Sequence, residues 1–166
     1  GIVTYIRTDS VRISEEALSA LRSYIDERYG AEYLPDEPNV YKGRVNAQDA
    51  HEAIRPTEVT RTPESIKESL SRDQFLLYRL IYNRFIASQM KPAVYENLTA
   101  EIRSDSVSLR YYGEHKVFSG FTAVYEEGSD EASEVPDTHM PRLTVGAKVT
   151  LSDIQAEQRF TQPPAR

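Results

Sequence analysis

A tyrosine, an arginine and an aspartate occupy alternate positions in the run Gly1-Ile-Val-Thr-Tyr-Ile-Arg-Thr-Asp-Ser10. If this run is extended, the side chains of Tyr5, Arg7 and Asp9 lie on one face. A phenol is a weak nucleophile at neutral pH, but a neighbouring guanidinium favours the phenolate and its planar fork suits a phosphate. These properties fit phosphoryl transfer to a tyrosine. Spacing alone still favours a plainer interpretation, a half-buried aromatic ring beside a surface cation, because the sequence contains 11 tyrosines.

A second candidate is His51, in the segment Ala-His-Glu-Ala-Ile-Arg-Pro that ends at Pro56. Zinc proteases carry His-Glu-x-x-His, but here Arg55 stands where the second histidine would be. His115 and His139 are distant in the sequence and cysteine is absent, so no metal site is predicted in this chain. A lone histidine is more often a hydrogen-bonded structural residue, and the segment by itself leaves that alternative open.

The elements expected to position these residues are mainly helical. The β-branched residues of Gly1–Tyr5 predict a short strand. Ser14, followed by two glutamates, predicts a helix that ends at Gly30. A loop is predicted over residues 31–47, and a helical turn over Gln48–Ile54 that stops before a proline.

A longer helix is predicted from Ser71 to Met90, after a short one that begins at Thr62 and Pro63. Its apolar residues cover most of its circumference, which predicts a mostly buried helix. These residues are Phe75, Leu76, Tyr78, Leu80, Ile81, Tyr82, Phe85, Ile86 and Met90.

Beyond Pro92 the pattern indicates strands, with a turn at Tyr112-Gly113 and a mobile acidic loop over Glu126–Asp137. The predicted strands are Val94–Ile102, Val107–Tyr112, Lys116–Phe121 and Lys148–Leu151. Helices followed by strands predict an α+β chain with a helical unit over residues 1–91 and a mainly β unit over residues 92–166.

Composition narrows the class of function. The net charge of −6 argues against a module that binds nucleic acid by bulk charge alone. Residues 1–92 hold 13 Lys and Arg against 14 Asp and Glu, while residues 93–166 hold 7 against 12. Any DNA site is therefore expected to be local and in the first part. No apolar run reaches the length of about 20 residues that spans a bilayer, and the lack of cysteine fits an intracellular protein. The chain begins within a strand-like apolar run without an initiator Met and stops at Gln-Pro-Pro-Ala-Arg, so an internal piece of a longer protein is expected.

Three segments together resemble the type IA DNA topoisomerases. The run from Gly1 to Ser10 resembles the active-site signature of that family, Gly-x-x-Thr-Tyr-x-Arg-Thr-Asp-Ser. The segment from Ala50 to Pro56 resembles a second hallmark at the family's spacing. Phe-Thr-Gln-Pro-Pro-Ala-Arg, at residues 160–166, resembles the family's Phe-Thr-x-Pro-Pro-x-Arg stretch. The matches occur in order from the first residue to the last. They do not separate a bacterial topoisomerase I from a topoisomerase III or the topoisomerase part of a reverse gyrase, but the third match and the order of the segments are most similar to topoisomerase I.

The resemblance implies roles for individual residues. Tyr5 resembles the catalytic tyrosine that attacks a DNA phosphate and forms a 5′-phosphotyrosine bond. Arg7 resembles the catalytic arginine that positions the scissile phosphate, and it is also expected to bind DNA. His51 resembles a histidine near the DNA, which Asp9 is expected to orient. Arg55 completes the expected DNA-binding set.

The resemblance also implies an architecture and partners. The first unit resembles part of the helical domain that carries the tyrosine, and the second resembles part of the β-rich gate domain. Mg²⁺ is implied as the cofactor of the full-length enzyme, with its ligands outside this chain. Single-stranded and negatively supercoiled DNA are the implied partners of a monomeric, cytoplasmic, nucleoid-associated enzyme, with no membrane. The alternative is a non-catalytic module of a larger DNA-processing protein that binds single-stranded DNA or acts as a hinge.

Overall fold

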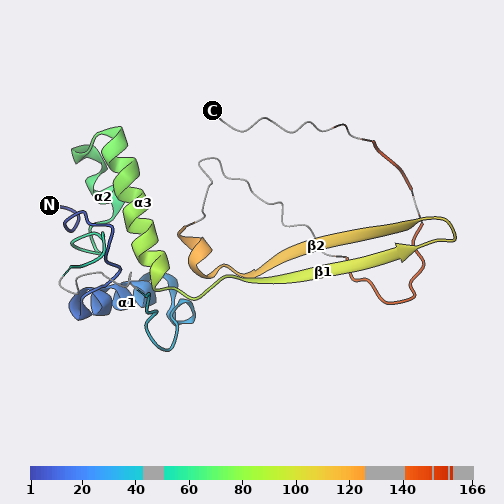
Figure 1. Ribbon diagram of the computed structural model, residues 1–166, viewed down its shortest axis with the longest axis horizontal. Helices are drawn as coiled ribbons and strands as arrows, with labels where there is room; N and C mark the ends of the chain where they lie inside the picture. Colours follow the sequence, from blue (N-terminus) through green and yellow to red (C-terminus); the bar gives the residue numbers. More distant parts are fainter. Residues whose placement is uncertain (43–50, 126–140, 151, 157, 159–166) are drawn as a thin grey trace.

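The chain forms a helical unit from which a long β-hairpin projects (Figure 1). The structure is a computed structural model, and it describes residues 1–42, 51–125, 141–150, 152–156 and 158. Three α-helices precede one antiparallel two-stranded sheet, which confirms the predicted α+β class. The acidic segment 126–137 and the run 160–166 lie outside the described residues. Among the helices described, none is long and apolar enough to cross a membrane.

Helix α1 spans Glu15–Tyr29 and confirms the prediction from its end signals. Its first turn carries Glu15 and Glu16, where the helix dipole favours negative charge. Ser14 is the N-cap residue, but its side chain makes no capping hydrogen bond. The helix ends at Gly30, whose φ of 105° lies in the left-handed region that favours glycine.

Helices α2 (Pro63–Ile66) and α3 (Arg72–Ser88) also begin where the sequence predicts. The Thr62 side chain accepts from the main-chain N–H of Ser65. Ser71 and Gln74 form a capping box at the start of α3, in which each side chain bonds the other's main chain. Helix α3 ends two residues before Met90, with Gln89 as its C-cap residue.

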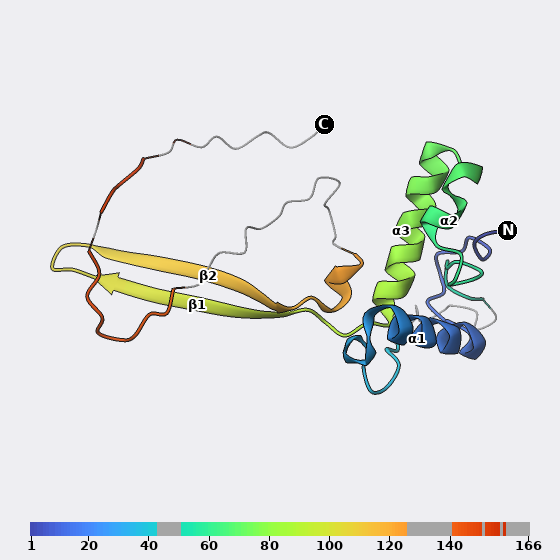
Figure 2. The same ribbon diagram turned by 180° about the vertical axis from the view of Figure 1, so that it is seen from behind.

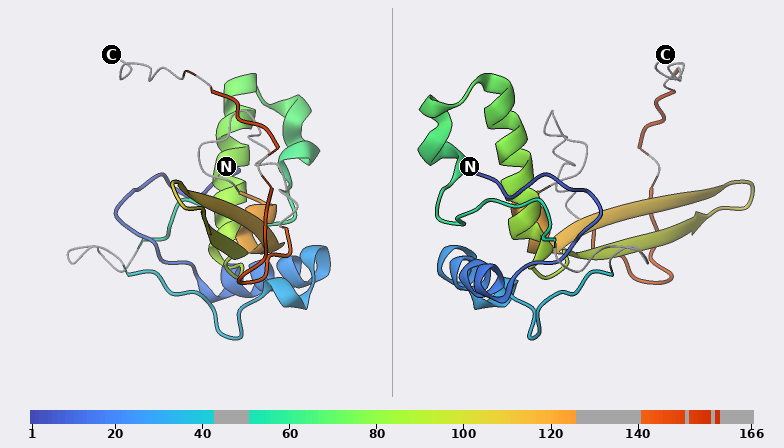
Figure 3. Two further views of the ribbon diagram at one scale, coloured as in Figure 1. Left: turned by 90° about the vertical axis from the view of Figure 1, so that its right-hand side faces the viewer. Right: turned by 60° about the vertical axis from the view of Figure 1, so that its left-hand side comes forward.

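The core lies where α1 crosses the C-terminal end of α3 (Figures 1 and 2). It consists of Leu21, Ile25, Tyr78, Tyr82, Phe85, Ile86 and Met90. The prediction of a mostly buried α3 is wrong, because Leu76, Leu77 and Leu80 are between 41 and 55% exposed. Helix α1 and the segments beside it cover one face of α3, so the opposite face of this helix stays open (Figure 3).

Strands β1 (Val94–Arg103) and β2 (Ser108–Phe118) pair antiparallel along their whole length. The predicted turn at Tyr112-Gly113 is wrong, because Gly113 lies inside β2 opposite Leu98. The chain instead turns between Ser104 and Val107, where the Ser104 N–H donates to the Val107 carbonyl at 2.9 Å. Residues 148–150 form no strand.

The base of the hairpin is attached to the helical unit by a few contacts. The rings of Tyr33 and Phe118 lie 4.8 Å apart, and the Phe121 N–H donates to the Lys91 carbonyl at 2.9 Å. Helices precede Pro92 and strands follow it, in the order that the sequence predicts. The division of the chain into two domains at residues 91 and 92 stays a prediction.

Candidate active site

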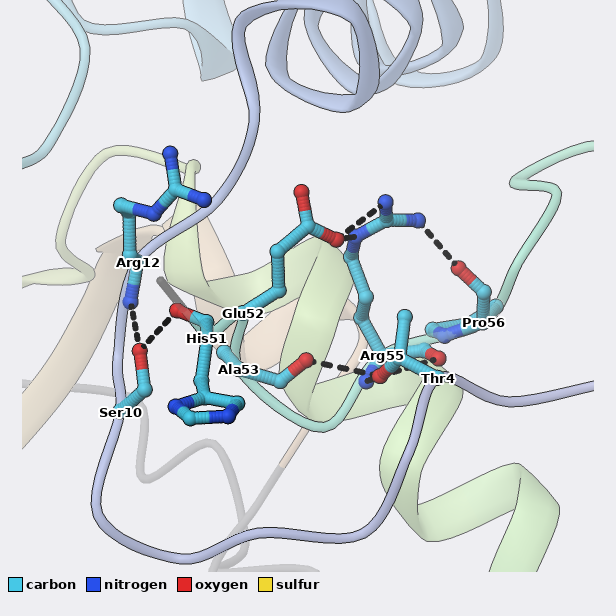
Figure 4. Close-up of polar contacts among 8 residues, drawn as sticks. All are labelled: Thr4, Ser10, Arg12, His51, Glu52, Ala53, Arg55 and Pro56. Atoms are coloured by element: carbon cyan, nitrogen blue, oxygen red, sulfur yellow. Dashed lines mark hydrogen bonds and ion pairs between the residues drawn. The ribbon is translucent and has the colours of Figure 1, made fainter. Parts of the chain in front are cut away.

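Residues 2–12 and 51–57, far apart in the sequence, lie side by side and form the frame of the site (Figure 4). Three main-chain hydrogen bonds join them: Thr4 N to Arg55 O at 2.9 Å, Thr57 N to Ile2 O at 3.1 Å and Ala53 N to Arg12 O at 2.8 Å. The predicted strand over Gly1–Tyr5 is wrong, because Val3 and Pro56 form only an isolated bridge. Proline has no N–H to donate, so the pairing does not extend into a regular ladder there.

The helical turn predicted over Gln48–Ile54 is wrong for the part that the structure describes. Residues 51–54 are not helical. Their main-chain groups bond instead to residues 2–12, which replaces the hydrogen bonds that a helical turn would supply. Residues 48–50 lie outside the described part of the chain.

Two tyrosines of helix α3 bond the stretch of chain that directly follows residues 51–57 of the frame. The Tyr78 hydroxyl donates to the Arg61 carbonyl at 2.7 Å, and the Tyr82 hydroxyl donates to the Val59 carbonyl at 2.7 Å. Both rings are buried in the core, so residues 59–61 are tied to the buried part of the helical unit. The segment that carries His51 leads directly into this anchored stretch.

Two hydroxyl groups fasten the ends of the loop that carries Tyr5. The Thr4 hydroxyl donates to the Ala53 carbonyl at 2.8 Å, and the Ser10 hydroxyl donates to the His51 carbonyl at 2.6 Å. Between them the chain curves away from the frame and returns (Figure 4). Sequence reasoning missed this role, although a hydroxyl residue on each side of the loop was a visible signal.

Tyr5 is 80% exposed, and no hydrogen bond among the described residues includes its hydroxyl. Three tyrosines that are more buried have raised pKa values. Burial raises the pKa of Tyr78, and it raises the pKa of Tyr82 further, where contact with Tyr24 adds to the effect. Burial also raises the pKa of Tyr29. These three phenols are harder to ionise than an ordinary tyrosine, whereas Tyr5 is open to a substrate from solution.

Arg7 and His51 are in contact across the frame. The Arg7 Nη1 lies 3.0 Å from Nε2 and 3.3 Å from Nδ1 of His51. A guanidinium can only donate, so one of the ring nitrogens accepts from it. The structure therefore brings together two of the residues that the sequence places in one site, and Tyr5 lies two positions from Arg7 on the same loop.

Asp9 differs from its expected arrangement. Residues 5–9 form a loop rather than a strand, so Tyr5 and Arg7 are exposed while Asp9 is half-buried. The contact with the His51 ring comes from Arg7, and no hydrogen bond described in the structure joins Asp9 to it. The Asp9 Oδ1 is buried and has no hydrogen-bond partner among the described residues.

Arg55 is engaged on the other side of the frame. Its Nε and Nη2 donate to one carboxylate oxygen of Glu52 at 3.1 and 2.6 Å, and its Nη1 donates to the Pro56 carbonyl at 2.9 Å. Burial raises the pKa of the Glu52 carboxyl, but hydrogen bonds from Ser14 and Arg55 outweigh that effect and lower its pKa overall. Only 12% of the Arg55 side chain is exposed, so this ion pair braces the segment that carries His51.

The described residues contain no group of three His, Cys, Asp or Glu side chains that could hold a metal ion. The carboxylates nearest the loop do not form such a group, since Glu52 bonds Arg55 and Asp9 stands alone. The described residues therefore do not fit a magnesium site.

Comparison with known proteins agrees with the geometry. The family model described as DNA topoisomerase matches residues 1–166, the whole chain. The structure is similar to full-length topoisomerase I from Thermotoga maritima, with 38% sequence identity and a TM-score of 0.62. That match covers 75% of this chain and 19% of the Thermotoga maritima chain, so this chain spans about a fifth of the length of that relative. With a family match along its whole length and a structural match at 38% identity, the chain belongs to the DNA topoisomerase family that its motifs resemble.

Proposed function

We propose that this chain carries the nucleophile of a type IA DNA topoisomerase that cleaves one DNA strand transiently, passes a strand through the break and rejoins it. Negative supercoils are relaxed in the process. The observation that carries the proposal is the position of Tyr5, which is 80% exposed on a loop whose Arg7, two residues further on, contacts His51.

In the proposed cleavage step the Tyr5 oxygen forms a bond to the phosphorus atom, and the bond from phosphorus to the 3′ oxygen of the neighbouring nucleotide breaks. The phenol gives up its proton, and the departing 3′ oxygen takes one up. The 5′ end of the cut strand is then held as a phosphotyrosine, and the free 3′-hydroxyl reverses the reaction when it attacks that bond. No high-energy cofactor is needed, because the phosphodiester energy is kept in the phosphotyrosine.

Arg7 is proposed to bind the phosphate that Tyr5 attacks. One of its nitrogens contacts His51, and among the described residues no other hydrogen bond involves its guanidinium, so its other N–H groups can donate to two phosphate oxygens. His51 is proposed to contact the DNA beside that phosphate. Since Arg7 and His51 are already in contact, the phosphate would meet a pair of side chains that is arranged before DNA binds.

Asp9 and Arg55 remain in the predicted DNA-binding set, with weaker support from the geometry. Asp9 carries a negative charge that repels phosphate, so we propose that it orients other groups and does not bind the DNA backbone itself. Arg55 is mostly covered and bonded to Glu52, so DNA would reach it only at the edge of its side chain.

Mg²⁺ is proposed as the cofactor of the complete enzyme, with ligands outside this chain, because the resemblance to the family implies it. When bound, the metal would stabilise negative charge on the phosphate. The proposed partners are single-stranded DNA and negatively supercoiled DNA. A monomeric enzyme in the cytoplasm, associated with the nucleoid, is the proposed setting.

Covalent trapping on labelled DNA tests the proposal. The complete topoisomerase that contains this chain is incubated with a single-stranded oligonucleotide labelled at its 3′ end, then denatured rapidly with detergent. We expect the label to move with the protein, because a 5′-phosphotyrosine bond retains the fragment that carries the 3′ end. The same oligonucleotide labelled at its 5′ end should give a shorter free fragment.

The matched variants are Tyr5→Phe and Tyr112→Phe. Tyr112 is also exposed, at 61%, but lies on strand β2 outside the site. Tyr5→Phe should abolish the adduct and leave oligonucleotide affinity near normal, while Tyr112→Phe should keep both. An adduct that survives in Tyr5→Phe would reject the proposal. Oligonucleotide binding without any adduct in the unmodified enzyme would instead support the non-catalytic binding module.

A further inference from the structure

We propose that Thr4 and Ser10 are positioning residues that clamp the loop of the nucleophile onto the segment that carries His51. The inference rests on the proposed function of Tyr5, and it adds two residues to which no role in the reaction has been assigned. Each hydroxyl bonds a main-chain carbonyl of the facing segment, one at each end of residues 5–9 (Figure 4).

At the Thr4 end of the clamp, two groups of one residue make three hydrogen bonds. The Thr4 N–H donates to the Arg55 carbonyl at 2.9 Å, and its hydroxyl donates to the Ala53 carbonyl at 2.8 Å. The same hydroxyl accepts from the Arg55 N–H at 3.0 Å. A hydroxyl that donates and accepts in this way cannot be replaced by a methyl group without leaving a carbonyl and an N–H unpaired. Tyr5 follows immediately, so its main chain is fixed at its start.

The Ser10 end of the clamp is directed at His51 itself. The Ser10 hydroxyl donates to the His51 carbonyl at 2.6 Å and accepts from the Arg12 N–H at 3.3 Å. The main chain returns to the frame here, and the Ala53 N–H donates to the Arg12 carbonyl at 2.8 Å. The loop is therefore closed on the residue whose side chain meets Arg7.

Together, the two ends of the clamp fix the main-chain positions from which the side chains of Arg7 and His51 meet. Their acceptors are the carbonyls of residues 51 and 53, so a short stretch of chain receives both hydroxyls. That stretch continues to residues 59–61, which Tyr78 and Tyr82 tie to the core. The clamp therefore connects an exposed loop with a segment that is bonded to the buried core. Its expected effect is on the orientation of the reacting groups, because most of the charge that attracts DNA lies on other side chains.

The test uses Thr4→Val and Ser10→Ala in the complete topoisomerase, with Thr4→Ser and Ser10→Thr as conservative variants that keep a hydroxyl. For each protein, single-turnover cleavage of an oligonucleotide, affinity for the same oligonucleotide and thermal midpoint are measured. We expect Thr4→Val and Ser10→Ala to slow cleavage on the order of 10- to 100-fold, as for small misplacements of reacting groups, with little change in affinity. Thr4→Ser and Ser10→Thr should restore most of the rate.

Control variants remove comparable hydroxyl bonds elsewhere. The Thr122 hydroxyl donates to the Ser119 carbonyl at 2.7 Å, and the Ser65 hydroxyl donates to the Thr62 carbonyl at 2.7 Å. Thr122→Val and Ser65→Ala should leave the cleavage rate unchanged. The clamp is rejected if the unmodified enzyme forms its Tyr5 adduct and Thr4→Val and Ser10→Ala cleave as fast as it does. It is also rejected if the control variants lose as much cleavage rate as Thr4→Val and Ser10→Ala for the same fall in thermal midpoint. A failure of Thr4→Ser and Ser10→Thr to restore the rate would reject it too. Failure of the unmodified enzyme to form any Tyr5 adduct would reject the proposed function itself.

Discussion

The guanidinium of Arg7 lies 3.0 Å from Nε2 of His51, although the two residues are 44 positions apart in the sequence. The contact joins the loop that carries Tyr5 to the segment that faces it. Because Arg7 can only donate, it holds the imidazole in an orientation where a ring nitrogen accepts. The two side chains are expected to act on DNA as a pair, and the first two predictions follow from this relationship.

Arg7→Lys should reduce cleavage and religation more than DNA binding. Lysine keeps the positive charge but loses the planar fork that reaches two phosphate oxygens at once. Interactions that are stronger in the transition state than in the ground state change the rate rather than the affinity. Single-turnover cleavage and oligonucleotide affinity measured side by side check this prediction, with Arg28→Lys on helix α1 as the control. Equal losses in rate and affinity would make Arg7 a simple phosphate anchor.

Arg7→Ala and His51→Ala should have effects on DNA binding that do not add. Each substitution removes the same contact, so the second should cost less once the first is made. A double-mutant cycle on oligonucleotide affinity should give a coupling free energy of about 0.5 kcal/mol or more. Additive effects would mean that the two side chains contact DNA independently.

The site shows what a sequence can and cannot predict. The residue types and the family resemblance predict that Tyr5, Arg7 and His51 share one site, and the structure shows the contact between Arg7 and His51. The arrangement of the loop could not be predicted locally, because its ends are set by hydrogen bonds between residues more than 40 positions apart. The pairing also explains why residues 51–54 are not helical, since the Ala53 N–H bonds the facing segment, while Pro56 limits the predicted strand to an isolated bridge.

The hairpin gives a second example. The sequence predicts the strand over residues 94–102 nearly to its ends, but it also predicts a turn at Gly113, which the structure does not form. In the structure Gly113 faces Leu98 within the ladder, and the Tyr111 side chain packs against it. A glycine in a strand-like sequence can mark a turn, or it can leave room for a neighbouring ring inside a strand. The sequence alone does not distinguish these two cases, because the answer depends on how the strands pair.

Glu52→Gln should destabilise the protein at neutral pH, and the difference should shrink in acid. The pKa of Glu52 is lowered in the folded protein, mainly through hydrogen bonds from Ser14 and Arg55 that outweigh its burial. A lowered pKa contributes stability above the ordinary value of 4.5, and this contribution is lost as the pH falls through the folded value. Denaturant unfolding of both proteins at neutral pH and below pH 4 checks this. A difference that is independent of pH would show that the charge of Glu52 does not stabilise the fold.

Leu21→Ala should cost about 2–5 kcal/mol in the free energy of unfolding, as for other buried leucines. Leu21 is completely buried between α1 and α3, whereas Leu80 is 45% exposed on the open face of α3. Leu80→Ala is therefore the matched control, and its cost should stay within about 0.5 kcal/mol. Chemical denaturation of the two variants compares them directly. Equal losses would mean that the open face of α3 is covered in solution.

The most direct test of the central claim is to identify the residue that is bonded to DNA. The complete topoisomerase is trapped on a single-stranded oligonucleotide, and the adduct is digested with nuclease and trypsin and analysed by mass spectrometry. The account predicts a nucleotide remnant on Tyr5, in the tryptic peptide that ends at Arg7. A remnant on another tyrosine, such as Tyr24 or Tyr29, would contradict it.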